Sequence, residues 1–154
     1  MSVIVPGSYD PVTEGHLDII RRAAEKYGEV YAVVFINPEK TYTFSLEDRV
    51  AMLMLATEDI EGCMVSYSTG MVVDYMREHG IERIVKGYRN ETDLAYERVQ
   101  AEFNLRHGYE TELLLTDPER AHISSTLARE LLSRGEATDG ILPPRVREYI
   151  DALK

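Results

Sequence analysis

Cysteine and positive charge are both scarce in this sequence. The single cysteine, Cys63, excludes any disulfide within the chain, which is typical of a protein from a reducing cytosol. Cys63 stands in an apolar run, so we expect a buried structural thiol. There are 17 Lys and Arg against 27 Asp and Glu, giving a formal net charge of -10 at pH 7. This balance disfavours a general nucleic-acid binder, which needs a basic face, but it still allows a few cations in one cleft to bind a small phosphate.

Long apolar runs and metal-binding motifs are also missing. No stretch approaches the ~20 apolar residues that span a bilayer, and the N-terminus lacks the basic and apolar regions of a signal peptide. We therefore expect a cytoplasmic protein with no membrane partner. The chain has no HExxH motif, no CxxC motif and no carboxylate cluster, so we expect no metal held by protein side chains alone.

Short apolar strands alternate with segments of helical periodicity along the chain. We expect strands over 2–5, 30–36, 64–66, 83–85 and 112–115, and helices over 16–27, 46–57, 71–79, 91–107, 124–134 and 145–153. The alternation indicates right-handed βαβ units. It predicts an α/β fold with a Rossmann-like, doubly wound, five-stranded parallel sheet in a single domain over residues 1–154. Ligands of such sheets bind at the carboxyl ends of the strands.

The turn after the first strand carries polar groups suited to phosphate. It is neither a Walker loop nor a GxGxxG fingerprint. It does offer hydroxyls at Ser8 and Thr13, and His16 lies at the start of a helix, where free N–H groups and partial positive charge favour phosphate. Gly15 would let the backbone approach a ligand closely. Taken alone, Thr13 could simply cap the helix, with His16 an ordinary residue of its first turn.

A second hydroxyl-rich helix start follows at Ile123-Ser124-Ser125-Thr126. Together, Thr13-x-Gly15-His16 and this segment resemble the T/H-x-G-H and I-S-S-T signatures of the nucleotidyltransferase superfamily. Further segments extend the resemblance to bacterial phosphopantetheine adenylyltransferases over essentially the whole chain: Pro6–Pro11, Lys40, Phe44–Arg49, Lys86–Arg89 and Asp93–Glu97.

The resemblance implies a reaction and its reagents. The family transfers the adenylyl group of ATP to 4′-phosphopantetheine, which gives dephospho-coenzyme A and pyrophosphate in coenzyme A synthesis. Mg²⁺ is the implied cofactor, and we expect it to arrive mainly with the nucleotide. The family is typically a cytoplasmic homohexamer, and the acidic net charge predicts no nucleic-acid partner.

Residue roles follow from the same resemblance. The implied catalytic residues are His16, Lys40 and Ser8. The implied ATP site comprises Ser8, Tyr9, His16, Gly87, Tyr88, Arg89, Glu97, Arg120, Ala121, His122, Ile123, Ser124, Ser125 and Thr126. The implied acceptor site comprises Ser8, Lys40, Val72 and Lys86.

Three of these positions depart from the family pattern. Ser8 replaces the usual threonine, Lys86 replaces the usual arginine and Arg120 stands where an aromatic is common. Lysine keeps the charge of arginine but loses its bidentate fork.

Simpler interpretations stand beside these roles. Without the family match, Lys40 would be a solvated loop lysine and Glu97 a solvated helix carboxylate. Two other functions remain open: a transferase of the same superfamily with another phosphorylated acceptor, such as a cytidylyltransferase or a nicotinamide mononucleotide adenylyltransferase, and a non-catalytic nucleotide sensor.

Overall fold

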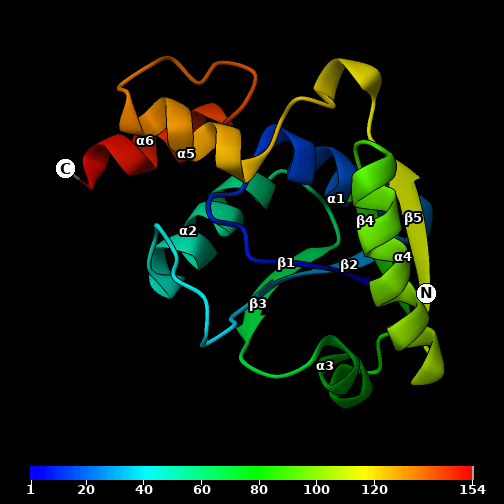
Figure 1. The fold of residues 1–154 in the computed structure, drawn as a ribbon. Coiled ribbons are helices and arrows are strands. Elements are labelled where there is room, and N and C mark those ends of the chain that lie inside the picture. The colour runs from blue at the N-terminus through cyan, green and yellow to red at the C-terminus, as the bar shows by residue number, and fades with distance from the viewer. Residues whose placement is uncertain (154) are drawn as a thin grey trace.

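The computed structural model describes residues 1–153 and contains a five-stranded sheet with helices on both faces (Figure 1). In chain order the elements are β1 (Ser2–Gly7), α1 (Glu14–Tyr27), β2 (Glu29–Phe35), α2 (Leu46–Thr57), β3 (Cys63–Ser68), α3 (Val72–His79), β4 (Arg83–Tyr88), α4 (Glu91–Arg106), β5 (Glu110–Leu115), a 3₁₀ turn η1 (Pro118–Arg120), α5 (Ser125–Ser133) and α6 (Pro144–Ala152).

All strand pairs are parallel, in the order β3-β2-β1-β4-β5. The chain leaves β1 toward β2 and β3 on one side, then returns to place β4 and β5 on the other. The order therefore reverses between β1 and β4, and a crevice at the carboxyl ends of these strands is where such sheets bind ligands. The predicted α/β, doubly wound, five-stranded fold is confirmed.

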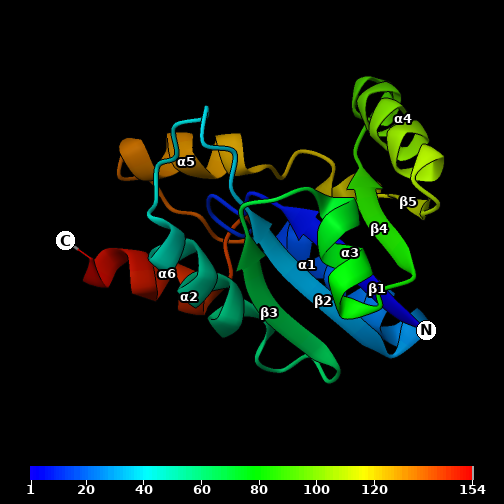
Figure 2. The ribbon, with the colours of Figure 1, turned by 90° about the horizontal axis from the view of Figure 1, so that it is seen from below.

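Alternate residues of the strands face two separate apolar cores. Val3 and Val5 of β1 pack in a core formed with α1, α2, α5 and α6, whereas Ile4 joins Val33 and Ile84 under α3. Figure 2 shows α3 crossing one face of the sheet, with α1 on the other. No helix in the part of the chain described is long and apolar enough to cross a membrane.

Strand β4 is longer than the sequence predicted. It continues through Lys86, Gly87 and Tyr88, which pair with residues 113–115 of β5. A Cβ atom on Gly87 would lie 2.7 Å from Cγ1 of Ile19, so the absence of a side chain lets α1 pack closely on the strand. Apolar patterning marks only the buried core of β4, and for this reason the prediction ended at residue 85.

Other boundaries shift by a few residues. Helix α1 begins at Glu14, because Thr13 caps it, and η1 was not predicted at all. Cys63, expected to be buried, is only partly buried at the start of β3. Burial raises the pKa of this thiol, which keeps it protonated.

Candidate active site

Two pockets adjoin at the carboxyl ends of β1 and β4. The first, which we call the His16 pocket, has a volume of about 370 Å³ and is lined by the first helix turn of α1, the end of β4 and the start of α5. The second, the Lys40 pocket, has a volume of about 730 Å³ and extends between the segments after β2 and β3 and the helix α4. Both are lined by Pro6, Lys86, Tyr96 and Glu97. The two pockets therefore meet at these four residues.

The ring of His16 is held by the cap of its own helix. The Thr13 backbone N–H donates to His16 Nδ1 at 3.0 Å, while Thr13 Oγ1 accepts from the His16 backbone N–H at 3.4 Å. This reciprocal pattern is a capping box, with histidine in the place that Glu or Gln usually takes. Because Nδ1 accepts a hydrogen bond, the neutral ring carries its proton on Nε2. His16 therefore offers an oriented N–H donor at Nε2.

The surroundings of His16 keep its ring neutral. Burial, together with the positive charges of Lys86 and Arg89, lowers its pKa from the ordinary 6.5 to about 4. A neutral donor can stabilise growing negative charge without titrating near neutral pH. The same two cations line the pocket together with the carboxylates Asp93 and Glu97, so its lining carries two charges of each sign.

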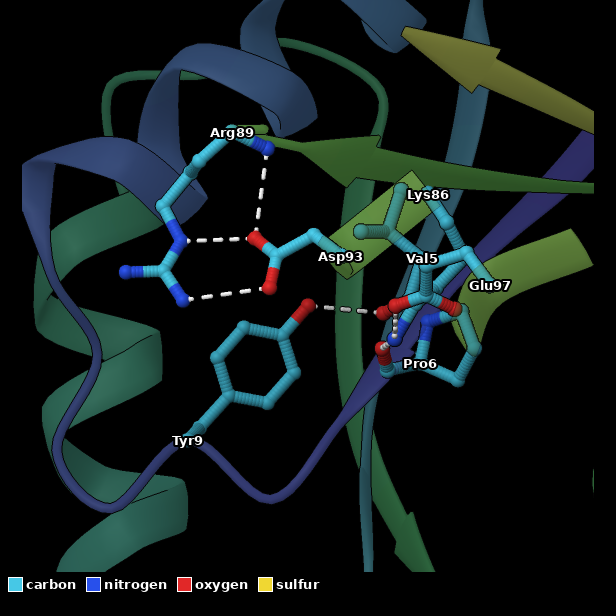
Figure 3. A network of polar contacts seen from close by, with 7 residues as sticks. All are labelled: Val5, Pro6, Tyr9, Lys86, Arg89, Asp93 and Glu97. Atoms are coloured by element: carbon cyan, nitrogen blue, oxygen red, sulfur yellow. Dashed lines mark hydrogen bonds and ion pairs between the residues drawn. The ribbon is translucent and has the colours of Figure 1, made fainter. Parts of the chain in front are cut away.

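Tyr9 forms the wall behind His16. Tyr9 is 2% exposed, and its hydroxyl donates to the Val5 carbonyl at 2.7 Å (Figure 3). Its ring centroid lies 4.8 Å from that of His16. Its φ of 49° lies in the left-handed region that non-glycine residues seldom adopt. We interpret Tyr9 as a fixed packing surface for His16, since its only polar atom is already bonded within the protein.

Hydrogen bonds join the Ile123–Thr126 motif to the turn that carries His16. Ser124 caps α5 by accepting from the Leu127 N–H at 3.0 Å, and Ser125 Oγ donates to the Pro11 carbonyl at 2.8 Å. Arg129 Nη1 donates to the Asp10 carbonyl at 2.8 Å. These bonds hold the N-terminus of α5, with its free N–H groups, against the turn that carries His16.

Two ion pairs connect the end of β4 and the residue after it with α4 (Figure 3). Lys86 Nζ lies 3.4 Å from Glu97 Oε2 and 3.5 Å from the Pro6 carbonyl. Arg89 Nε lies 2.8 Å from Asp93 Oδ2. The Lys86–Glu97 pair stands where the pockets meet, and the Arg89–Asp93 pair lines the His16 pocket.

A buried arginine forms hydrogen bonds to two of the segments that line the Lys40 pocket or adjoin it. Arg49 is 2% exposed and donates to the carbonyls of Ser8 and Phe44, each at 3.1 Å. Its guanidinium also lies 3.9 Å from the ring centroid of Tyr42. Arg49 thereby joins the turn after β1 to the segment carrying Lys40, whose exposed side chain lies at the pocket rim.

The structure brings most of the implied site residues together. All four residues of the implied acceptor site line the Lys40 pocket. Of the implied ATP site, nine residues line the His16 pocket: Tyr9, His16, Gly87, Arg89, Glu97, Ile123, Ser124, Ser125 and Thr126. Ser8 lies in the neighbouring pocket. Four others line neither pocket: Tyr88, Arg120, Ala121 and His122. Arg120 instead lies 3.5 Å from Asp117, in an ion pair of the η1 turn.

Three supporting residues were given no role from the sequence: Arg49, Asp93 and Arg129. Asp93 stands four residues after Arg89 at a helix start, a spacing that favours an ion pair and could have indicated it. Arg129 follows Thr126 by one helical turn, which could likewise have placed it beside the motif. Nothing in the sequence marks Arg49 as buried, because its partners are backbone carbonyls.

The chain is similar to known proteins over nearly its whole length. Residues 4–131 match the cytidylyltransferase-like family model. The chain is 42% identical to the phosphopantetheine adenylyltransferase of Symbiobacterium thermophilum, over 96% of this chain and 95% of that protein. It is also 42% identical to the enzyme of the same name from Corynebacterium diphtheriae, over 96% and 94% of the two chains. It is 38% identical to that from Clostridium novyi, over 93% and 90%. The chain therefore belongs to the phosphopantetheine adenylyltransferase family and is a nucleotidyltransferase.

Proposed function

We propose that this enzyme transfers the adenylyl group of ATP to 4′-phosphopantetheine and forms dephospho-coenzyme A and pyrophosphate. The observation that carries the proposal is the pair of pockets meeting at Lys86 and Glu97. The His16 pocket offers phosphate-binding donors and suits the nucleotide. The lining of the larger Lys40 pocket combines the cations Lys40 and Lys86 with apolar side chains such as Val72, which suits a phosphate on a long arm.

The proposed reaction is a direct in-line displacement without a covalent enzyme intermediate. A phosphate oxygen of the acceptor bonds to the α-phosphorus, the bond from that phosphorus to the bridging oxygen breaks, and pyrophosphate leaves with the electron pair. The acceptor oxygen is already anionic near neutral pH, so alignment and charge stabilisation supply the catalysis. Ser8, Lys40 and Lys86 orient the acceptor. The Nε2–H of His16 stabilises charge at the reacting phosphate, and Arg89 with the start of α5 holds the pyrophosphate.

Magnesium is proposed to enter with the nucleotide. Asp93 and Glu97 are the acidic residues lining the His16 pocket, and each is already paired with a cation. Within residues 1–153, no group of three His, Cys, Asp or Glu side chains could hold a metal. These surroundings fit an ion bound through phosphate oxygens and water, where it would neutralise phosphate charge.

A pyrophosphate-release assay with a panel of acceptors tests the function. Purified protein with ATP and Mg²⁺ is expected to release pyrophosphate with 4′-phosphopantetheine and to lose this activity when the metal is chelated. Release with nicotinamide mononucleotide or another phosphorylated acceptor instead would support a different transferase. ATP binding without release with any acceptor would support a nucleotide sensor.

We further propose that the protein is a cytoplasmic homohexamer. Support comes from α4, a 16-residue helix that buries none of its residues within one chain. Tyr96 is 66% exposed, Val99 64% and Phe103 41%, so this helix presents apolar surface that a second copy could cover. Light scattering at micromolar concentration is expected to give six times the mass of one chain. A monomer in that measurement would refute the assembly but not the chemistry.

A further inference from the structure

Asp93 holds the guanidinium of Arg89 by one edge. Arg89 is the residue after β4, and Asp93 is the third residue of α4. Asp93 Oδ2 accepts from Arg89 Nε at 2.8 Å and from the Arg89 backbone N–H at 3.2 Å, and Oδ1 accepts from Nη2 at 3.4 Å. The Asp93 backbone N–H donates to the Asn90 side chain at 2.9 Å. The carboxylate therefore lies in the first turn of α4 and holds the Arg89 guanidinium through the contacts that Figure 3 shows.

This contact leaves the other edge of the guanidinium available. Among residues 1–153, Arg89 Nη1 has no hydrogen-bond partner. Both residues line the His16 pocket together with Ser124, Ser125 and Thr126. An arginine bound side-on by a carboxylate is restricted to few rotamers, so its remaining N–H donors keep a set direction.

A carboxylate next to a phosphate pocket needs a compensating role. By Coulomb's law alone, the negative charge of Asp93 opposes a triphosphate or pyrophosphate bound there. The carboxylate also partly neutralises Arg89, which weakens the long-range attraction of that cation. Its benefit must therefore come from geometry, through the direction in which Arg89 presents Nη1.

We propose that Asp93 is a positioning residue, which acts through Arg89 to present its Nη1 donors to the departing pyrophosphate group. This inference rests on the proposed function. It assigns Asp93 no contact with the substrate. The chemical class that the held guanidinium recognises is a pyrophosphate or the β,γ end of a nucleoside triphosphate.

The variant Asp93→Asn separates positioning from charge, because the two effects have opposite signs. Removal of the negative charge alone would tighten ATP and pyrophosphate binding and leave kcat unchanged. Loss of positioning is expected to lower kcat/KM by on the order of 10- to 100-fold and to weaken pyrophosphate binding. Steady-state kinetics and calorimetric titration with pyrophosphate measure both.

A double-mutant cycle shows whether Asp93 acts through Arg89. In an Arg89→Ala background, Asp93→Asn is expected to cause no further loss, since the side chain that it positions is gone. Asn90→Ala is the matched control: it removes the other polar contact at the start of α4 but leaves the Arg89 side chain and its carboxylate in place. It is expected to lower the melting temperature without the loss in kcat/KM.

Each outcome decides the inference. Tighter pyrophosphate binding by Asp93→Asn, an equal loss in the Arg89→Ala background, or the same kinetic loss in Asn90→Ala would overturn it. Wild-type protein that fails to turn over phosphopantetheine would contradict the proposed function separately. The role of Asp93 would then still be decided by pyrophosphate titration. The proteins compared are the wild type, Asp93→Asn, Arg89→Ala and the double variant.

Discussion

Replacement of His16 by alanine is expected to lower kcat by roughly 10²–10³, the scale for losing one donor to a transition-state oxyanion. KM for ATP and for the acceptor should change little, because the charge that Nε2–H stabilises grows mainly in the transition state. The reason lies in the capping box, which fixes Nδ1 on Thr13 and leaves Nε2 as the donor. Steady-state kinetics measure the effect. A near-normal kcat would leave His16 with only its role in the helix cap.

Two further variants separate the chemistry from the cap. His16→Gln supplies the side chain that a capping box usually has at this position, so α1 should keep its stability while kcat stays low. His107→Ala is the matched control: this histidine ends α4, bonds the Phe103 carbonyl at 3.0 Å and lines neither pocket. It should leave kcat unchanged.

The lowered pKa of His16 also predicts the pH dependence. A required imidazolium with an ordinary pKa would make kcat fall as pH rises through about 6.5. Because the pKa is about 4, His16 is already neutral there, and its contribution should stay constant from about pH 6 to about pH 9. The same shift makes folding stability depend on pH. Because His16 takes up a proton more readily in the unfolded chain, stability is lost as pH falls from 6.5 toward 4. The variant His16→Gln should weaken that acid dependence in a melting curve.

The fold could be predicted because its determinants are local. Helix α2 was predicted at its observed bounds, since Ser45 is a good cap and apolar residues follow at helical spacing. Strand β4 was predicted too short because Lys86 and Gly87 interrupt the apolar pattern. They are held in the sheet by pairing with β5, which no local pattern records.

The same distinction between local sequence and tertiary packing applies to the residues of the site. Both signatures lie at helix starts after strands, so the meeting of His16 with Ser124–Thr126 followed from the fold. Contacts between a strand and the interior of the helix that follows it did not follow, because they depend on how α4 lies over the sheet. The Lys86–Glu97 pair is the clearest example: the two residues are eleven positions apart, and each was assigned to a different substrate.

The Lys86–Glu97 pair is reversed in charge at one side by the variant Lys86→Glu. This variant is expected to lower kcat/KM by roughly 10²–10³, equivalent to several kcal/mol of like-charge repulsion. The new carboxylate would face Glu97, whose side chain is only 14% exposed, at the point where both pockets meet. It would also oppose the phosphates of both substrates. The fold should survive, because the Lys86 side chain is 30% exposed. Kinetics for each substrate, together with a melting curve, measure the change.

Lys86→Arg should be tolerated, because a guanidinium can keep both the charge and the contact with Glu97. Lys86→Ala is expected to raise KM for phosphopantetheine more than KM for ATP. That variant alone is ambiguous, since it also leaves the shielded carboxylate of Glu97 without its cation.

The double variant Lys86→Ala/Glu97→Gln resolves this ambiguity. If Lys86 serves only to neutralise Glu97, removal of both charges should restore acceptor KM to the value of Glu97→Gln alone. If Lys86 binds the acceptor phosphate, acceptor KM should stay raised relative to Glu97→Gln, because the glutamine cannot replace the lost cation. We expect the second result, since Lys86 lines the same pocket as Lys40 and Ser8. Full restoration would remove Lys86 from acceptor binding and leave it as the structural partner of Glu97.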